Sequence, residues 1–495
     1  MSAGSPGELA EVIPDGDILA SREAGGRFLR GGGMRVLAYG SGLLVGLAST
    51  PLVTRHLGPV DWGHFITVTS LIFIVAALTE GGVGNLGVRE LSIGDDASRR
   101  SFMSNLLGLR IALSLLGAAG AIAFTFAAGY PSVLVEGTAL ACVSLLLQGV
   151  QATLGVALTA RLRLGWLAVM DFTAQFITAA FMVLLVLAKA PLLPFYTVAI
   201  LTAGVSLVLV TSLVHNEVSL RPAFSLSGWR TLMSDSIVYA AATTLGIVYF
   251  RIVVIAMSLL ASRTQTGYFS LSFRILDIIN GIPWLLVASA FPILARAARD
   301  DDERLRYALQ RLFDGGLVVG GFVSLCVIIG APFAVKVIGG AKFDPSVEAL
   351  QIMGAGIIAT FLVAIWSFAL LTLRLYRELI LVNGGVVALA VALSVLLIPS
   401  HQASGAAVVT ASLEVVLAGA YVLVLARRRP DLRPSLRGVP RVGLALAAGL
   451  GVAAILPVHP LIAVAAGGLT MLAGLLALGA LPAEFLQALR RRPAG

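Results

Sequence analysis

The sequence is poor in charged residues and contains only two cysteines. Asp, Glu, Lys and Arg together make up 12% of the 495 residues, roughly half their share in a soluble domain. That scarcity excludes an ordinary soluble globular chain. Cys142 and Cys326 both lie inside long apolar segments, so neither a disulfide framework nor a cysteine metal site is expected. The five histidines are scattered without ligand spacing, and we expect no metal and no cofactor.

Apolar residues are abundant and make up 58% of the chain. They occur in blocks of roughly 20 residues, the length of helix that crosses about 30 Å of bilayer hydrocarbon. Strands of a transmembrane β-barrel would alternate polar and apolar residues, and these blocks do not. The sequence therefore predicts an all-α, polytopic membrane protein with about fourteen transmembrane helices. We expect these helices at 34–54, 64–84, 103–128, 132–159, 166–188, 191–214, 233–260, 267–294, 314–338, 345–372, 377–399, 402–426, 438–457 and 460–480.

The placement of Lys and Arg predicts the orientation of the helices. The two tails and the even-numbered connections carry 27 of the 35 basic residues, and the odd-numbered connections carry five. Cytoplasmic loops of helical membrane proteins collect Lys and Arg, so both termini are expected in the cytoplasm. The same rule explains the net charge of +9, and no nucleic-acid partner is needed to account for it.

A short sequence recurs in two places and suggests an internal repeat. Residues 61–65 read DWGHF and residues 265–269 read QTGYF, and each opens the second span of a run of six. Two six-helix halves would share one orientation because six is even. We therefore expect a cytoplasmic tail at 1–33, an N-terminal six-helix lobe at 34–214, a cytoplasmic linker at 215–232, a C-terminal six-helix lobe at 233–426, a basic loop with helices 13 and 14 at 427–480, and a cytoplasmic tail at 481–495.

Three glycine motifs indicate helix packing rather than ligand binding. Residues 82–87 read GVGNLG, but a dinucleotide site would need a preceding strand and a βαβ unit around this motif. The sequence shows an apolar helix there instead. Gly42-x-x-x-Gly46 and Gly316-x-x-x-Gly320 are typical of close contacts between membrane helices.

Three arginines lie inside predicted spans and are the main functional candidates. Arg110 lies about 10 Å from the cytoplasmic side, and Arg251 and Arg274 lie about 14 Å and 10 Å below the outer face. An Arg at the centre of a membrane helix costs roughly 2.5–3.5 kcal/mol on insertion scales, so each needs a partner or a wet cavity. Glu80 is the expected partner of Arg110, and Asp277 lies on the same helix face as Arg274.

These charges allow two interpretations. In the first they are structural ion pairs: Arg110 with Glu80, Arg274 with Asp277, and Arg251 with Glu348 or Glu414. In the second, the three arginines line a cationic lumen between the lobes that binds an anionic head group, because the planar guanidinium donates paired hydrogen bonds to phosphate. Glu80 and Asp277 would then be charge partners or ion-coupling carboxylates.

A stretch near the N-terminus resembles a known family. Residues 50–59 (TPLVTRHLGP), 62–65 (WGHF), 78–85 (LTEGGVGN) and 89–91 (REL) resemble the polysaccharide and O-antigen flippase family. This family belongs to the multidrug/oligosaccharidyl-lipid/polysaccharide (MOP) exporter superfamily. The motif covers about 39–91, and beyond it the resemblance rests on the 6+6+2 layout.

The resemblance implies two six-helix lobes in a V that work by alternating access. It implies a multi-pass protein of the bacterial cytoplasmic (inner) membrane that moves a polyprenyl-pyrophosphate-linked oligosaccharide to the outer leaflet for cell-surface polysaccharide biosynthesis. Membrane lipid would be a partner, as would glycosyltransferases or a polymerase of the same pathway. A transporter of this kind needs no catalytic residues, so we do not expect an enzyme.

Three alternatives remain open at this stage. A peptidoglycan-precursor flippase of the same superfamily would share the helices and the cationic lumen. An ion-coupled multidrug exporter would favour acidic residues in its lumen, because its substrates are cationic, and an unpaired Arg251 argues against it. A membrane polysaccharide polymerase or glycosyltransferase would need a sizeable outward loop to hold its reacting groups, and the outward connections here are short.

Overall fold

Helices make up almost all of the chain that the computed structural model describes, namely residues 22–480 without 81, 83, 85–86, 89, 92–95, 162 and 301. No strand occurs in this part of the chain, which confirms the all-α class. The helices are α1 (Arg22–Glu80), α3 (Asp96–Ala127), α4 (Ser132–Ala160), α5 (Leu164–Leu187), α6 (Leu192–Val214), α7 (Leu226–Leu260), α8 (Arg263–Asp300), α9 (Asp302–Ile338), α10 (Ser346–Thr372), α11 (Tyr376–Arg428), α12 (Gly438–Ile455) and α13 (Pro460–Ala477), with short 3-10 helices η2 (Ala341–Phe343) and η3 (Pro430–Leu432).

Eleven helical segments of the described chain are long and apolar enough to cross a membrane. Two of the helices, α1 and α11, are each broken once, at Gly58 and Gln402. Each of these helices therefore contains two of the predicted spans. The multi-pass membrane architecture is confirmed, whereas the exact number of crossings and the cytoplasmic placement of both termini stay predictions. The two predicted tails, 1–33 and 481–495, lie largely or wholly outside the described residues.

Local chemistry explains both breaks. Gly58 has φ 71°, a left-handed conformation that glycine adopts without a steric penalty, and Pro59 follows it without a backbone N–H. Gln402 has φ 49°, which is unfavourable for a side chain with a Cβ. Its side chain compensates, because Oε1 accepts a hydrogen bond from the Ser262 N–H at 3.1 Å and Nε2 donates to the Pro399 carbonyl at 3.1 Å.

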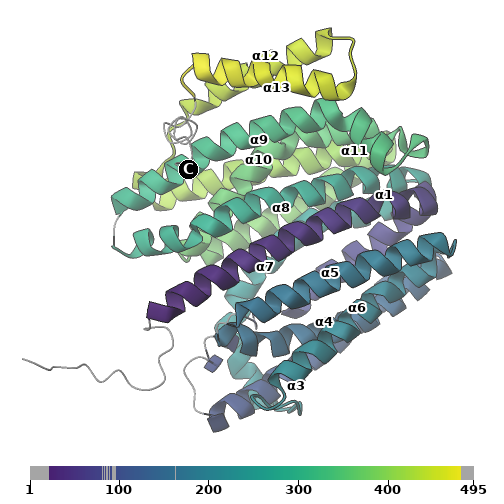
Figure 1. Ribbon diagram of the computed structural model, residues 1–495, viewed down its shortest axis with the longest axis vertical. Coiled ribbons are helices and arrows are strands. Elements are labelled where there is room, and N and C mark those ends of the chain that lie inside the picture. Colours follow the sequence, from purple (N-terminus) through teal and green to yellow (C-terminus); the bar gives the residue numbers. More distant parts are fainter. Residues whose placement is uncertain are drawn as a thin grey trace, which may run out of the picture.

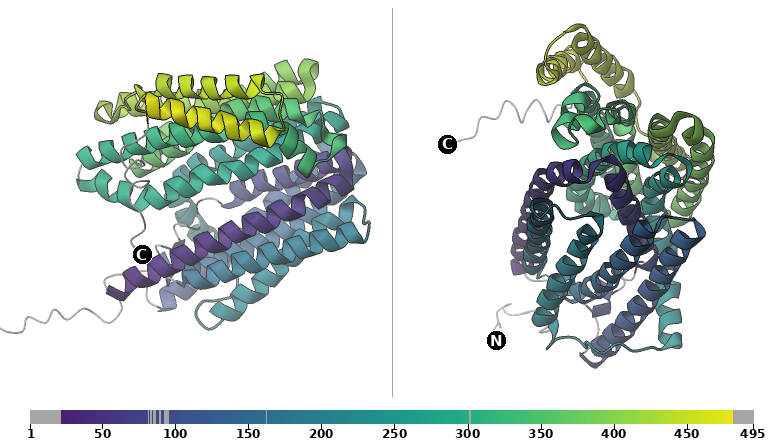
Figure 2. Two further views of the ribbon diagram at one scale, coloured as in Figure 1. Left: turned by 45° about the horizontal axis from the view of Figure 1, so that its top comes forward. Right: turned by 90° about the vertical axis from the view of Figure 1, so that its right-hand side faces the viewer.

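The helices form two groups with α1 between them. In Figure 1 the teal and blue helices α3–α6 lie on one side of α1, and the green helices α8–α11 lie on the other. The first helix packs on α5, α7 and α8, so it joins both groups. The helices α12 and α13 pack on each other and on α9, and Figure 2 shows this yellow pair on the outside of the bundle. The lobe boundaries stay predictions.

The first glycine motif, residues 82–87, lies partly outside the described residues, and the two GxxxG motifs have different outcomes. A Cβ on Gly316 would meet Ile365 at 2.6 Å, and one on Gly320 would meet the Ile358 backbone at 3.2 Å, so this motif is confirmed as a contact between α9 and α10. The expectation for Gly46 was wrong, because a Cβ there would meet nothing within 4 Å. Gly46 lines a cavity instead, and the spacing of two glycines could not distinguish a packed face from an open one.

Candidate functional site

A cavity of about 260 Å³ lies between the two groups of helices. It is bounded by both halves of α1, by α5, and by α7 and α8, so residues from each side contribute to its wall. The lining residues are Gly46, Ser49, Thr50, Val53, Trp62, Phe65, Ile66, Thr69, Phe73, Gln175, Thr178, Ala179, Met182, Arg251, Phe273, Arg274 and Asp277. The cavity therefore contains two of the three predicted arginines and one of the predicted carboxylates.

Asp277 lies between the two arginines of this cavity. Its Oδ1 is 2.9 Å and its Oδ2 is 3.0 Å from Nη2 of Arg251, and its Oδ2 is 3.4 Å from Nη1 of Arg274. The expectation that Arg251 lacks a close partner, or that it reaches Glu348 or Glu414, was therefore wrong. Helical spacing predicted the Arg274–Asp277 contact, but the shorter bonds cross from α8 to α7. The three side chains together carry a net charge of +1.

The two arginines differ in their surroundings. Arg251 is 12% exposed, and its guanidinium lies 4.6 Å from the ring centroid of Phe73 and 5.3 Å from that of Phe273. Cation–π attraction at such distances holds a desolvated guanidinium in place. Arg274 is 38% exposed and makes a longer bond to Asp277. Arg274 is thus the arginine that presents more of its donors to the cavity.

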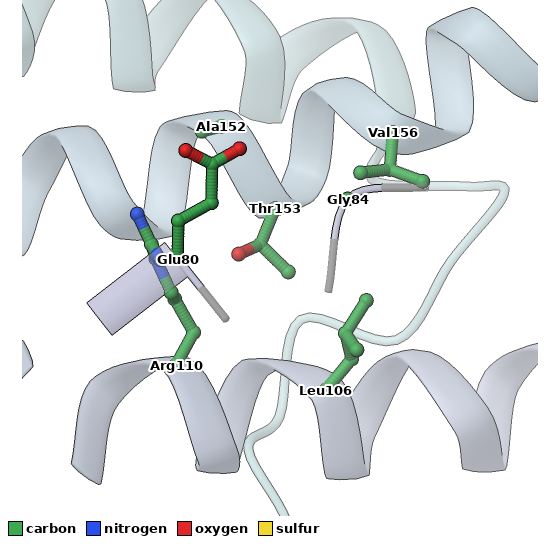
Figure 3. A pocket seen from close by; sticks show the side chains of 7 residues that line it. All are labelled: Glu80, Gly84, Leu106, Arg110, Ala152, Thr153 and Val156. Carbon is green, nitrogen blue, oxygen red and sulfur yellow. The ribbon is translucent and has the colours of Figure 1, made fainter. Parts of the chain in front are cut away.

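Arg110 does not share this cavity. It lines a separate pocket of about 50 Å³ between α3, α4 and the end of α1, together with Glu80 and Thr153 (Figure 3). The side chain is 7% exposed, and its Nη1 has no hydrogen-bond partner among the described residues. Glu80 lines the same pocket and interacts electrostatically with Arg110, although no described ion pair joins the two side chains. The structure therefore brings Arg251 and Arg274 into one cavity and places Arg110 in another, and a shared role of the three arginines in substrate binding stays a prediction.

The contacts of Arg110 explain why its direction was not predictable. A Cβ on Gly149 would lie 3.0 Å from Nε of Arg110 and 2.9 Å from Oγ of Ser114. The absence of a side chain at Gly149 lets the guanidinium lie against α4, within the N-terminal group of helices. Depth along a helix follows from counting residues, but this lateral contact depends on how α3 and α4 are rotated.

A buried polar cluster in the C-terminal group of helices was missed. Glu414 is 2% exposed, and its Oε1 accepts a hydrogen bond from the Tyr249 hydroxyl at 3.3 Å. Nearby, the Tyr421 hydroxyl donates to Oδ1 of Asn383 at 2.6 Å, and Nδ2 of Asn383 donates to the Ala242 carbonyl at 3.0 Å. The signal was available, because Glu414 lies in the middle of a predicted apolar span, where an acid is as costly as an arginine.

The two copies of the repeated sequence contact each other beyond one end of the cavity. A Cβ on Gly63 would lie 2.9 Å from the backbone nitrogen of Gly267, and a Cβ on Gly267 would overlap the carbonyl oxygen of Pro59. Only glycine permits this approach of the two backbones. Because Gly267 precedes Arg274 by seven residues, the contact lies about 10 Å along the helix axis from the charged cluster.

Arg55 strengthens the same contact. Its Nη2 donates hydrogen bonds to the carbonyl oxygens of Lys336 at 3.0 Å and Val337 at 2.6 Å, at the C-terminal end of α9. The Lys336 carbonyl also accepts the Gly340 N–H at 3.2 Å, and a cation at the C-terminal end of a helix interacts favourably with the helix dipole. Arg55 thus ties the first group of helices to the second at the end of the bundle where Gly63 meets Gly267.

Comparisons with known proteins agree with this architecture. A family model described as polysaccharide biosynthesis protein matches residues 52–348. The inward closed structure of the lipid II flippase MurJ has a TM-score of 0.68 at 13% identity, covering 92% of this chain and 99% of that chain. An inward-facing multidrug resistance MATE family transporter of the MOP superfamily has a TM-score of 0.64 at 13% identity, covering 79% and 95%.

A third solved structure is a MOP superfamily transporter from Pyrococcus furiosus, described as having a binding pocket of reverse polarity. It has a TM-score of 0.56 at 13% identity, covering 83% of this chain and 96% of that chain. No curated protein sequence matches the chain. At these identities the likeness to solved structures establishes the fold, which this chain shares with MurJ and with the MATE family transporter.

Proposed function

We propose that this chain, which belongs to the polysaccharide biosynthesis protein family, is a flippase for a lipid-linked oligosaccharide. Its substrate would be a polyprenyl-pyrophosphate-linked sugar, carried from the cytoplasmic to the outer leaflet of a bacterial inner membrane. Family membership and the fold support a membrane transporter. The finer assignment rests on the chemistry of the cavity between the two groups of helices.

The observation that carries the proposal is the Arg251–Asp277–Arg274 cluster. The other residues that line the cavity are uncharged, so the cluster gives the cavity wall a net charge of +1. An incoming pyrophosphate competes with Asp277 for the two guanidinium groups, and Arg274 is the first that it meets because it is the more exposed. When no substrate is bound, Asp277 offsets one of the two positive charges, which lowers the free-energy cost of burying them in the membrane.

Transport by this cavity requires that it open to one side at a time. We propose that the Gly63–Gly267 contact and the Arg55 bonds close the outer end and separate when the head group leaves. The membrane potential assists, because an anion moving out of a cytoplasm at negative potential gains about 2.3 kcal/mol per charge per 100 mV. Asp277 and Glu80 remain candidates for ion coupling. Glu414 is a further candidate, because it is a buried carboxyl on a neighbouring helix of the C-terminal group.

A peptidoglycan-precursor flippase is the second candidate, favoured by the likeness to MurJ at a TM-score of 0.68. Its lipid would present the same pyrophosphate to Arg274, so the cluster serves both substrates. A multidrug exporter for cations fits less well, because the cavity carries two arginines against one carboxylate. Glycosyltransferases or a polymerase that act on the same lipid are the expected protein partners of the flippase.

The test is transport by purified protein in proteoliposomes. Arg274→Gln should reduce the flipping of a fluorescent polyprenyl-pyrophosphate oligosaccharide at least about tenfold, because it removes a charge-assisted contact to phosphate. Arg263→Gln removes the same charge from the exposed start of the same helix and should leave transport unchanged. Equal transport by Arg274→Gln and the wild type would refute the cluster as the head-group site. A parallel assay with a peptidoglycan precursor separates the two candidate substrates.

A further inference from the structure

A second cavity of about 360 Å³ lies outside the two groups of helices, where α12 and α13 join α9. Figures 1 and 2 show this helix pair on the outside of the bundle. The proposed transport cycle gives the pair no role. The residues that line the cavity are Tyr307, Gln310, Arg311, Asp314, Ser435, Arg437, Gly438, Arg441, Gly479 and Ala480.

This cavity is basic. Three of its lining residues are Arg311, Arg437 and Arg441, and Asp314 is the one acid among them. Asp314 can neutralise one arginine, so an excess of two positive charges remains. Arg441 is oriented by a backbone contact, because its Nη1 donates to the Gly479 carbonyl at 3.4 Å. Gln310 and Ser435 exchange two hydrogen bonds, of 2.7 Å and 3.3 Å, which hold the loop that carries Arg437 against α9.

Two other arginines of the basic loop are paired with acids elsewhere. Arg428 binds Glu378 at 2.7 Å. Arg429 binds Asp302 at 2.7 Å and Asp431 at 2.8 Å, and its guanidinium holds the pKa of the Asp431 carboxyl below the usual value. These acids are therefore already committed to arginines outside the cavity. The excess charge of the cavity is not balanced by them.

The cavity lies at the level where lipid head groups are found. Helix α9 has 37 residues and is roughly 55 Å long, so it extends well beyond about 30 Å of hydrocarbon. Tyr307 and Arg311 are on its first turns, Arg437 and Gly438 are at the start of α12, and Gly479 follows the end of α13. All of these positions are at the ends of membrane helices, on one side of the bundle.

The helix beside the cavity offers an exposed apolar residue on the same face as one of the arginines. Leu444 follows Arg441 by three residues on α12, a spacing that makes two residues neighbours on a helix surface, and its side chain is exposed. Buried residues such as Val442 and Ala445 face the other helices. A molecule that placed an anionic group in the cavity could therefore lay a hydrocarbon chain against Leu444.

We propose that this cavity binds the phosphate of an anionic phospholipid, with Arg437 and Arg441 as its principal ligands. Basic pockets between membrane helices select anionic head groups, and the guanidinium fork matches phosphate oxygens. The bound lipid fastens the α12–α13 pair to α9 through the loop held by Gln310. The inference does not depend on what the central cavity carries.

The test compares lipid binding by two double variants of the full-length protein in detergent. Arg437→Gln with Arg441→Gln removes two cavity ligands, and Arg427→Gln with Arg433→Gln removes the same charge from exposed positions at the end of α11 and in the loop that follows it. Retention of phosphatidylglycerol and of phosphatidylcholine with identical chains is measured by native mass spectrometry. At about fivefold per arginine near a membrane surface, the first variant should lose about 25-fold in affinity for phosphatidylglycerol. The second variant should be unchanged.

Three outcomes would overturn the proposal. The first is a wild type that retains phosphatidylcholine as well as phosphatidylglycerol. The second is an equal loss in both double variants, which would indicate an effect of general surface charge. The third is displacement of the lipid by glycerol 3-phosphate at equimolar concentration, which would indicate a site for a free phosphate compound. Size-exclusion profiles identical to that of the wild type confirm that the variants are folded.

Discussion

Gly63→Ala tests whether the contact between the two repeated sequences closes the outer end. The added Cβ would lie 2.9 Å from the Gly267 nitrogen and 3.1 Å from its Cα. Ordinary contacts begin at 3.4 Å, so the two backbones must separate by roughly 0.5 Å. Backbone yields less readily than the end of a side chain, and overpacking of this kind costs about 1–3 kcal/mol. The whole cost is confined to the state in which Gly63 touches Gly267.

A ligand or mutation shifts a two-state equilibrium by its differential effect on the two states. A penalty of about 1–3 kcal/mol on the closed state therefore raises the population of the open state roughly 5- to 150-fold. Gly120→Ala is the matched control, because a Cβ there would meet nothing within 4 Å. Gly267→Ala should act in the same direction as Gly63→Ala, since its Cβ would overlap the Pro59 carbonyl.

The assay follows access to the cavity. Thr69 lines it, and Thr69→Cys in a chain whose Cys142 and Cys326 are replaced by serine gives one reporter thiol. Intact cells are exposed to a membrane-impermeant maleimide, and the rate of labelling is measured. Gly63→Ala should raise this rate at least about fivefold over the parent and over the Gly120→Ala control. A labelling rate equal to that of the parent would refute the closing role of this contact.

Three further variants, at two positions, test the buried acidic side chains. Asp277→Ala leaves Arg251 and Arg274 without their shared carboxylate, so thermal unfolding in detergent should show a loss of about 3 kcal/mol. Added inorganic pyrophosphate should stabilise this variant more than the wild type, and the absence of that difference would contradict an anion site. Glu414→Ala leaves the buried Tyr249 hydroxyl without its acceptor, at a cost of about 1–3 kcal/mol. Glu414→Gln keeps an acceptor and should lose less; equal losses in the two variants would show that this hydrogen bond contributes nothing.

The intramembrane charges show how far sequence reasoning reached. Their presence inside spans was evident from the apolar runs around them, and the spacing of three residues predicted the Arg274–Asp277 contact. The shorter bonds from Arg251 to Asp277 join residues 26 positions apart on different helices. Nothing in either helix alone encodes that pairing. Arg110 was assigned to the same lumen because it too is an arginine inside a predicted span, although it faces a pocket within the N-terminal group.

The repeated sequence shows a different limit of prediction from the sequence. The similarity of residues 61–65 and 265–269 predicts that they occupy matching positions in two related halves. It does not predict that Gly63 and Gly267 touch, because that contact forms only when both groups of helices pack together. Gly46 makes the same point in reverse, because its spacing from Gly42 suggested packing whereas the assembled helices leave it at a cavity wall.

The sequence by itself determined that this is a helical membrane protein, roughly where its helices run, and which family it resembles. Those properties follow from the transfer of each residue between water and lipid and from short local motifs, and both are nearly independent of the rest of the chain. The tertiary structure decided which charges meet, which glycines touch and where the cavities lie. A residue count specifies depth along a helix axis, whereas the rotation of the helix about that axis is set only when its side chains pack against neighbouring helices. Arg251 and Arg110 lie in different cavities for that reason.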